Sequence, residues 1–229
     1  MTAAPHDLDP VETQEWLDSL DGVLKVTNQA AFETSRALAR LEAAGLVTGV
    51  ATQNVDRLHS LAGQRTVWEL HGAYDRVVCL ECGRLVPRAE VDERLRATNP
   101  DYPIETDPQK VAITPEADRA AAEACVFEPP VCESCGGMLK PDIVFFGESL
   151  PPAMDGAMEA AKECDVVLVA GTSLAVLTGL WVVRQAMARG AELVVVNRGR
   201  TAVDEIAGLR IEGGTSKVLG AVADALLAR

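Results

Sequence analysis

A short stretch of the sequence holds most of the residues whose types could do chemistry. Asn54 and Asp56 offer an amide beside a carboxylate, and His59 and His71 follow them. An amide and a carboxylate can stabilise developing positive charge, while a histidine, which titrates at about pH 6.5, can remove a proton near neutral pH. The stretch ends in Cys79-Leu-Glu-Cys82, a spacing typical of half of a metal site. It therefore predicts a proton-transfer site close in sequence to a bound metal.

Two predicted strands position these side chains. Residues 45–51 are apolar and rich in β-branched side chains, so the strand that they predict opens into a loop at residues 52–56. Residues 67–70 predict a second short strand that ends just before His71. Because ligands bind at the carboxyl ends of strands in open α/β sheets, we expect the two loops to converge at one edge.

A second Cys-x-x-Cys pair, Cys132 and Cys135, matches the first pair, Cys79 and Cys82. Glycine follows each pair directly, and this allows the tight turn in which two thiolates face one ion. The alternative is two unrelated pairs of thiols. We expect a structural zinc site, which has no open position for a substrate because four thiolates complete the coordination sphere.

Two further predicted strands end in residues suited to a nucleotide. The strand at residues 165–170 is apolar after Asp165, as expected for a buried parallel strand, and a helix at 175–189 separates it from the strand at 192–196. Glycine lets a nucleotide approach the backbone, while hydroxyl and amide groups can bind phosphate or ribose. The residues that follow the two strands are Gly171, Thr172, Ser173, Asn197, Arg198 and Gly199.

Several motifs together resemble the sirtuins, the NAD-dependent protein deacylases. They are Thr-Gln-Asn-Val-Asp-x-Leu-His, Glu-Leu-His-Gly, the two Cys-x-x-Cys pairs, Lys-Pro-Asp-Ile-Val-Phe-Phe-Gly-Glu at 140–148, Gly-Thr-Ser-Leu at 171–174 and Val-Asn-Arg-Gly at 196–199. The resemblance extends over residues 28–227 in the family's order. The amino-acid sequence around the cysteines is most similar to that of the class that includes the mitochondrial lipoamidase-type sirtuin.

This resemblance implies an α/β fold with a Rossmann-like parallel sheet, incomplete at its amino-terminal strand, and a small zinc-binding module. Residues 28–76 and 141–229 would form the NAD-binding domain. Residues 77–140 would form the zinc module with a helical insert, and residues 1–27 lie outside the resemblance. The implied reaction removes acyl groups from protein lysine with NAD as co-substrate.

The resemblance also implies roles for individual residues. His71 would act as general base, with Asn54 and Asp56 beside the ribose, whereas His59 is expected to be structural. A peptide substrate would pair with the backbone of Val144, Phe145, Phe146, Gly147 and Glu148. The implied NAD contacts are Gln53, Asn54, Val55, Asp56, Gly171, Thr172, Ser173, Asn197, Arg198, Gly199 and Thr215.

One motif of the family, a strand followed by a Gly-Ala-Gly-x-Ser phosphate loop, does not occur in this sequence. Glycine-rich turns at helix N-termini cradle pyrophosphate, so NAD binding depends on what replaces the loop. In the family this strand lies between the equivalents of residues 47–51 and 143–146. The sheet must close the gap, fill it with the strand-like residues 23–27, or take a strand from another chain. Alternative functions are a catalytically impaired binding module and a protein ADP-ribosyltransferase.

Composition narrows the class of partner. The net charge of −13 argues against a nucleic acid as partner, because basic clusters recognise nucleic acids. We expect a cytoplasmic protein because no membrane span or signal peptide is evident.

The amino-terminal segment is a separate feature, and its residues 7–20 predict a helix. Residues 7–24 resemble the amino terminus of the bacterial homodimeric pyruvate dehydrogenase decarboxylating component. The segment is therefore either a passive remnant or a docking segment for the pyruvate dehydrogenase complex.

Overall fold

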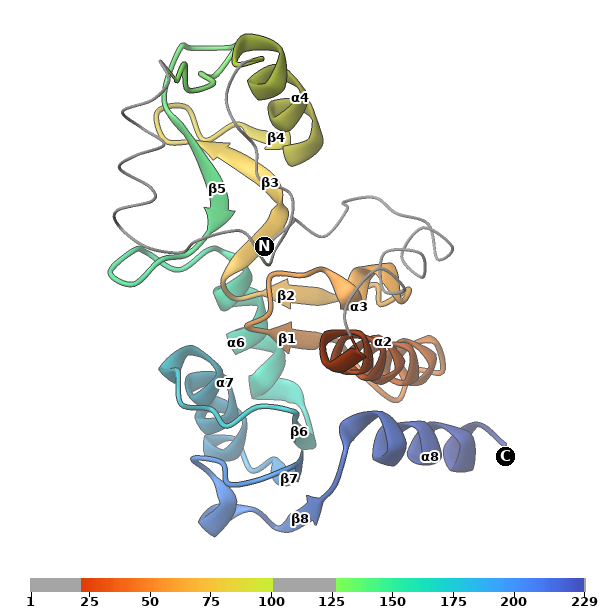
Figure 1. Ribbon diagram of the computed structural model, residues 1–229. Coiled ribbons are helices and arrows are strands. Elements are labelled where there is room, and N and C mark those ends of the chain that lie inside the picture. Colours follow the sequence, from red (N-terminus) through yellow and green to blue (C-terminus); the bar gives the residue numbers. More distant parts are fainter. Residues whose placement is uncertain (1–21, 101–126, 229) are drawn as a thin grey trace. The chain divides into compact units, whose positions relative to one another are not determined.

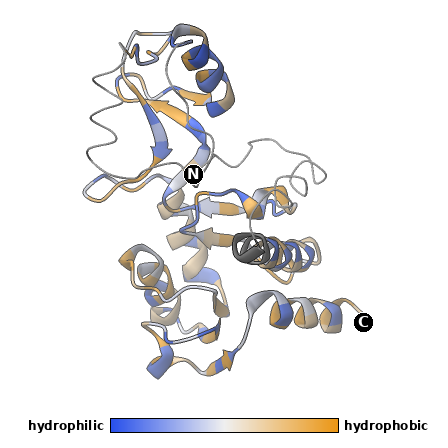
Figure 2. Ribbon diagram, in the orientation of Figure 1, coloured by the Kyte–Doolittle hydropathy of each residue, from blue (hydrophilic) through white to orange (hydrophobic). Residues whose placement is uncertain are grey.

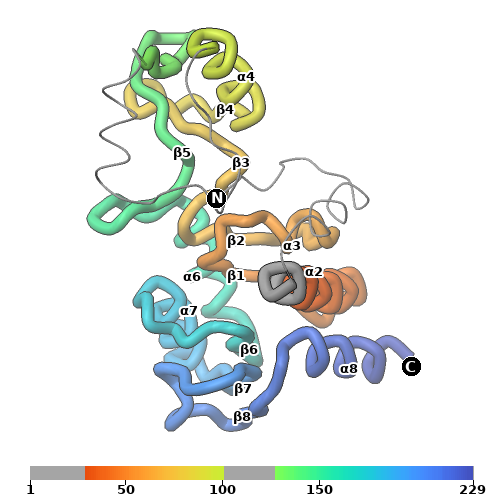
Figure 3. Tube along the Cα trace, viewed as in Figure 1, coloured from red at the N-terminus to blue at the C-terminus, as the bar shows by residue number. Residues whose placement is uncertain are grey.

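The computed structural model describes residues 22–100 and 127–228, with side chains from residue 29 onward. These residues form two compact units, of which the smaller contains residues 73–100 and 127–142 and the larger combines residues 22–72 with 143–228. Figure 3 traces the chain through them: it leaves the larger unit after β2, builds the smaller unit, and returns before α6. The larger unit is therefore assembled from two separate stretches of sequence.

The larger unit alternates helices with parallel strands (Figure 1). Strand β1 pairs with β2, and β6, β7 and β8 form a second parallel sheet. The elements are α2 (Gly22–Ala43), β1 (Val50–Thr52), α3 (Leu58–Leu61), β2 (Val67–Glu69), α6 (Ala153–Glu163), β6 (Val166–Ala170), α7 (Leu177–Ala188), β7 (Glu192–Asn197), η1 (Asp204–Ile206), β8 (Leu209–Glu212) and α8 (Thr215–Leu227).

Helix α2 includes residues 23–27, so the prediction of a strand there is wrong. β-Branched side chains at these positions are compatible with either state, but no glycine or proline interrupts the chain between Val23 and Ala44, and the helix continues through them. Its apolar face, which includes Leu38 and Leu41, packs against α8 and β7. Gly45 adopts a φ of 75° and ends the helix.

The parallel strands fall into two sheets rather than one. Within the described part of the chain, no strand pairs with the second edge of β1 or with the second edge of β6. Val50 of β1 and Ala170 of β6 pack against the same cluster of α2 and α8 side chains, so one pair of helices covers both sheets. Val166 and Leu168 remain 51% and 36% exposed, although apolar parallel strands are usually buried.

The prediction that residues 143–146 form the strand on the other side of this gap is also wrong. Residues 144–146 lie outside any strand, and β5 (Leu139–Ile143) pairs with β3 in a different sheet, so these residues do not border the gap. Among the described residues the gap is neither closed nor filled by residues 23–27. The sheet of β1 and β2 and the sheet of β6, β7 and β8 therefore remain unpaired with each other in this part of the chain.

The smaller unit contains an antiparallel sheet of order β4-β3-β5, with β3 at Gly72–Cys79, β4 at Leu85–Pro87 and helix α4 at Arg88–Thr98. Val77, Val86 and Val91 form its apolar core. Helix α4 is coloured mostly as hydrophilic in Figure 2, in agreement with the small size of that core. Helix α4 thus supplies a helix in the insert that the resemblance implies between the two cysteine pairs, and residues 101–126 of that insert lie outside the described residues.

None of the helices in the described ranges is both long and apolar enough to cross a membrane. The helix predicted at residues 7–20 also lies outside the described residues.

Candidate active site and metal centre

The carboxyl ends of β1 and β2 meet at one edge, as the sequence predicts. The two strands pair in parallel with Thr52 opposite Glu69, and the N–H of Leu70 donates to the carbonyl of Thr52 at 2.9 Å. Gln53 and His71 therefore both lie just beyond the carboxyl ends of these paired strands.

Thr178, in the first turn of α7, joins these two side chains. Its Oγ1 lies 2.7 Å from Nε2 of Gln53 and 2.9 Å from Nε2 of His71. The Nε2 of Gln53 also lies 3.3 Å from the carbonyl of Val176. Thr178 is only 7% exposed, so a buried hydroxyl connects the glutamine and the proposed base. Sequence reasoning missed Thr178, because a threonine early in a predicted helix carries no chemical signal of its own.

Asn54 and Asp56 lie in the loop after β1, and both are exposed. The Oδ1 of Asp56 accepts the N–H of Leu58 at 3.1 Å, and the N–H of Asn54 donates to Oγ1 of Thr52 at 3.1 Å. Within the described residues, no hydrogen bond joins either side chain to His71. Both can therefore face a ligand at the rim, while Asp56 also accepts the N–H of the first residue of α3.

Arg57 and His59, which follow Asp56, differ in backbone conformation and in burial from ordinary loop residues. Arg57 has a φ of 61°, which is uncommon outside glycine, and its guanidinium lies 3.2 Å from the carboxylate of Glu69. Burial lowers the pKa of His59, and the charge of Asp56 offsets part of that effect. Its buried Nδ1 has no hydrogen-bond partner in the described part of the chain. The structural role expected for His59 stays a prediction.

The turn after β6 approaches the start of α8. Gly171 has a φ of 65°, and a Cβ there would lie 3.4 Å from Cγ2 of Thr215. Leu174 is buried with a φ of 55°, a conformation that strains a non-glycine residue and is often found at functional turns. The hydroxyl of Thr172 accepts the N–H of Leu174 at 3.1 Å, while Ser173 is exposed. Gly171 therefore leaves space beside Thr215 that a side chain would fill.

Asn197 shapes the turn after β7. Its Nδ2 donates to the carbonyls of Arg198 and Gly199, both at 3.1 Å, and the residue is 8% exposed. The carboxylate of Glu212 accepts the N–H of Gly199 at 2.9 Å. The amide nitrogen of Asn197 therefore holds its own loop, and any contact that it makes with a ribose would come from its oxygen.

Residues 144–148 form a turn, which corrects the prediction of an apolar strand through Phe146. The N–H of Val144 donates to the carbonyl of His71 at 3.0 Å, and the carboxylate of Glu148 accepts the N–H of Phe145 at 2.9 Å. Gly147 has a φ of 90°, while Phe146 is 99% exposed. The segment is attached to the rim through Val144 and presents phenylalanine to solvent.

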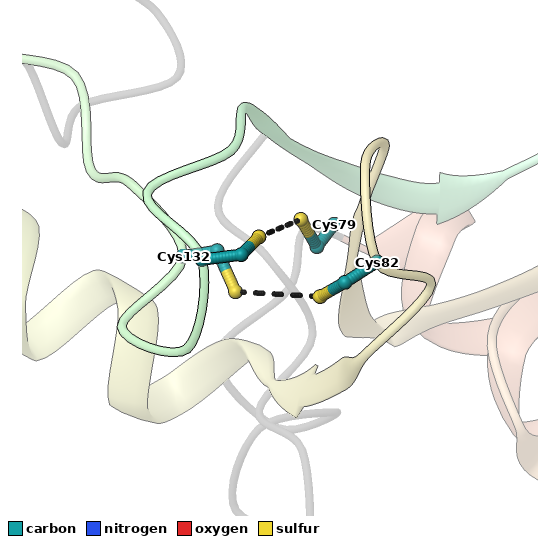
Figure 4. Close-up of side chains that lie close together, drawn as sticks. Cys79, Cys82 and Cys132 are labelled. Carbon is teal, nitrogen blue, oxygen red and sulfur yellow. Dashed lines mark hydrogen bonds between the residues drawn. The ribbon is translucent and has the colours of Figure 1, made fainter.

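The four cysteines of the smaller unit converge on one point. Their sulfur atoms all lie within 4.8 Å of one another, with Cys79 3.5 Å from Cys135 and Cys82 3.8 Å from Cys132. Figure 4 shows the side chains of Cys79, Cys82 and Cys132 turned toward one another from two loops. A zinc ion fits this cluster, because a tetrahedral site with Zn–S bonds of about 2.3 Å separates its sulfur atoms by about 3.8 Å.

Glycine and backbone donors prepare the cluster for a cation. Gly83 and Gly136 adopt φ values of 71° and 74°, and their N–H groups bond to the carbonyls of the first cysteine of each pair. Backbone N–H groups of Ser134 and Cys135 lower the pKa of Cys132 to about 6. The N–H of Gly137 acts in the same direction on Cys135, but the neighbouring thiols raise its pKa to about 12. Four thiolates therefore need a positive ion between them.

Comparison with known families agrees with this architecture. The model of the Sir2 family matches residues 7–178. The chain belongs to the Sir2 family. This family accounts for the parallel sheets and for the four-cysteine cluster of the chain.

Curated Sir2 relatives align with most of this chain. NAD-dependent protein deacetylase 1 of Mycobacterium avium (strain 104) is 49% identical over 193 residues, which are 83% of this chain and 68% of that protein. NAD-dependent protein deacetylase 1 of Streptomyces coelicolor is 43% identical, over 83% of this chain and 64% of that protein. The human mitochondrial lipoamidase sirtuin-4 is 34% identical, over 92% and 67%. The chain thus spans 64% to 68% of the length of these three relatives.

Solved Sir2 structures share the fold. A crystal structure of Sir2 with the inhibitor EX-527, 2′-O-acetyl-ADP-ribose and a deacetylated p53 peptide superposes with a TM-score of 0.65 at 28% identity, covering 86% of this chain and 72% of that one. A Sir2 complex with a p53 peptide and NAD⁺ also gives 0.65, at 26% identity, covering 96% of this chain and 79% of that one.

Among the predicted site residues of this Sir2 chain, the structure brings together Gln53 and His71 through Thr178, and Gly171 with Thr215. It unites all four cysteines. Asn54, Val55 and Asp56 stay in the loop beside Gln53, and Arg198 and Gly199 in the turn after β7. The roles of these residues in catalysis and NAD binding remain predictions.

Proposed function

We propose that this chain removes acyl groups from protein lysine with NAD as co-substrate. The observation that carries the proposal is the hydrogen-bonded group Gln53–Thr178–His71 at the carboxyl ends of parallel strands. It supplies a histidine held in a defined orientation, as a general base requires. The relatives named as NAD-dependent protein deacetylases support the same reaction, and so do the solved Sir2 complexes with peptide and NAD⁺.

The described residues fit a nucleotide at this rim. Gly171 leaves room beside Thr215, and the exposed side chains of Asn54 and Asp56 lie in the loop next to Gln53. Bound NAD supplies an electrophilic ribose carbon. In this chain His71 would accept a ribose hydroxyl proton, while Asn54 and Asp56 would stabilise positive charge on the ribose.

A second candidate is a Sir2-type binding module with little or no catalysis. The unpaired edges of β1 and β6 favour it, because in the described residues no strand joins the two sheets beneath the nucleotide site. The sequence also has no Gly-Ala-Gly-x-Ser loop to cradle the pyrophosphate. Such a module would bind acylated protein without turning over NAD.

Two measurements separate these functions. Isothermal titration with NAD should show micromolar binding if the chain is an enzyme. The absence of binding heat at high NAD concentration would instead favour the binding module. The chain should then be incubated with NAD and either an acetyl-lysine or a lipoyl-lysine peptide, followed by mass spectrometry. Loss of the acyl mass together with free nicotinamide supports deacylation. A gain of an ADP-ribosyl group on protein would instead show ADP-ribosyl transfer.

We further propose that the chain is cytoplasmic and that residues 7–24 dock it to the pyruvate dehydrogenase complex. The support is the resemblance of this segment to a component of that complex. A tagged chain should co-purify the complex, and a variant that lacks residues 2–21 should not. Equal recovery of the complex with both forms would reject the docking role.

A further inference from the structure

We infer that Thr178 is a positioning residue, which holds the imidazole of His71 as the tautomer with its proton on Nδ1. The inference deepens the proposed function and rests on it, because it assigns a partner to the proposed base. It concerns a residue outside the motifs that the sequence suggested.

The argument starts from the orientation of the Gln53 amide. The atom 3.3 Å from the carbonyl oxygen of Val176 must carry hydrogen, because two carbonyl oxygens cannot bond to each other. This atom is therefore the amide nitrogen. Its second N–H points to Oγ1 of Thr178, 2.7 Å away. The hydroxyl oxygen of Thr178 is thus already an acceptor.

The hydroxyl hydrogen of Thr178 is then left for His71. The Oγ1 and Nε2 atoms are 2.9 Å apart, a normal length for a hydrogen bond. If Thr178 donates to Nε2, that nitrogen must be the unprotonated one, and in neutral imidazole the proton then lies on Nδ1. The hydrogen-bond chain runs from Gln53 through Thr178 to His71.

Packing fixes this chain of hydrogen bonds in the absence of a ligand. Thr178 is 7% exposed, and Leu180 of the same helix lies in the core beneath β6 and β7. The neighbouring residue is glycine, and a Cβ at Gly179 would lie 3.2 Å from Oε1 of Gln53. Glycine thus leaves room for the Gln53 amide. Its hydrogen bonds to the carbonyl of Val176 and to Oγ1 of Thr178 hold it in place, so the hydroxyl keeps its direction.

The consequence is a base prepared before substrate binds. Nε2 of His71 is kept unprotonated and directed at a hydroxyl oxygen. A ribose hydroxyl that reaches Nε2 can replace the Thr178 hydrogen there, while Gln53 continues to hold the Thr178 oxygen. Thr178 acts through His71 and transfers no proton to substrate.

The test is the tautomer of His71, read from two-bond ¹H–¹⁵N correlations of the ¹⁵N-histidine-labelled chain at pH 9, where free histidine is neutral. Wild type and Thr178→Ser should show the proton on Nδ1, whereas Thr178→Val should show a mixture or the Nε2 form. His6 and His59 serve as internal controls that should not change. A wild-type proton on Nε2, or an unchanged tautomer in Thr178→Val, overturns the inference.

A second variant covers the case in which Thr178→Val fails to fold. Gln53→Leu removes the donor to Thr178, so the hydroxyl can rotate and the tautomer of His71 should become mixed. A wild-type tautomer in folded Gln53→Leu would then overturn the inference.

Turnover provides an independent readout. Thr178→Val should lower kcat about tenfold or more with little change in the KM for NAD, and Thr178→Ser should restore most of it. An unchanged kcat in folded Thr178→Val overturns the positioning role. If wild type itself turns over no substrate, the proposed function fails, and the tautomer measurement still decides the role of Thr178.

Discussion

Oγ1 of Thr178 and Nε2 of His71 lie 2.9 Å apart although 107 positions separate the two residues in the sequence. The proposed base is thus oriented by a helix that follows a different strand from its own. Substitutions in the first turns of α7 should therefore affect catalysis even where they touch no substrate.

The first prediction concerns Gly179→Ala. A Cβ at this position would lie 3.0 Å from Cδ2 of Leu174 and 3.2 Å from Oε1 of Gln53, so both neighbours must shift. We expect a loss of about 1 kcal/mol in unfolding free energy and roughly a tenfold loss in kcat/KM. Denaturant unfolding and steady-state turnover measure the two effects.

Gly220→Ala in α8 is the matched control. A Cβ there meets nothing within 4 Å, so the better helix propensity of alanine should raise stability by about 0.5–1 kcal/mol and leave turnover unchanged. If both alanine variants behave alike, the crowding at Gly179 has no functional effect.

The second prediction concerns Glu42, whose carboxylate accepts the N–H groups of Arg65 and Thr66 at 2.7 and 2.8 Å. The carbonyl of Thr66 accepts the N–H of Val50, so Glu42 supports the start of β1. Glu42→Gln should destabilise the chain by about 0.5–1 kcal/mol near neutral pH, the low end for charge-assisted bonds because solvent screens the site. Chemical denaturation at several pH values measures this loss.

The pH dependence of this effect has a definite sign. Burial raises the pKa of Glu42, but the N–H groups of Arg65 and Thr66 outweigh it and lower the pKa below its ordinary value of 4.5. The stabilisation is therefore present above about pH 4.5 and disappears as pH falls through the lowered pKa. Glu33→Gln, on the exposed side of α2, is the control and should change little. A Glu42 effect that persists at pH 2 would contradict this account.

The third prediction concerns zinc. Purified protein should contain about one zinc per chain, and Cys132→Ser should lose it together with solubility, because three thiolates no longer complete the site. Elemental analysis of the two proteins measures the metal. Cys164→Ser is the matched control, since Cys164 lies outside the cluster, and it should keep its zinc. A soluble, folded variant with all four cluster cysteines changed to serine would remove the structural role.

Local patterns in the sequence account for what could be predicted. The parallel strands, the helices after them and the four-cysteine cluster each have a signal within a few residues, such as an apolar run or a Cys-x-x-Cys-Gly turn. The position of Thr178 beside His71 has no such signal, because it depends on how the start of α7 meets the residues that follow β1 and β2.

The errors have the same origin. Residues 23–27 are β-branched enough for a strand, yet they continue an uninterrupted helix. Phe145 and Phe146 look like buried strand residues, but Gly147 turns the chain with a φ of 90° and Phe146 stays 99% exposed. An apolar run indicates burial only when another element covers it.

The most direct test of the account compares wild type with His71→Ala. Both proteins are titrated with NAD and then incubated with NAD and an acyl-lysine peptide, and mass spectrometry follows the peptide. The account predicts that wild type releases the acyl group, while His71→Ala binds NAD nearly as well but leaves the peptide acylated, because a base acts only after the ligand is bound. Equal deacylation by the two proteins, or none by wild type, would contradict it.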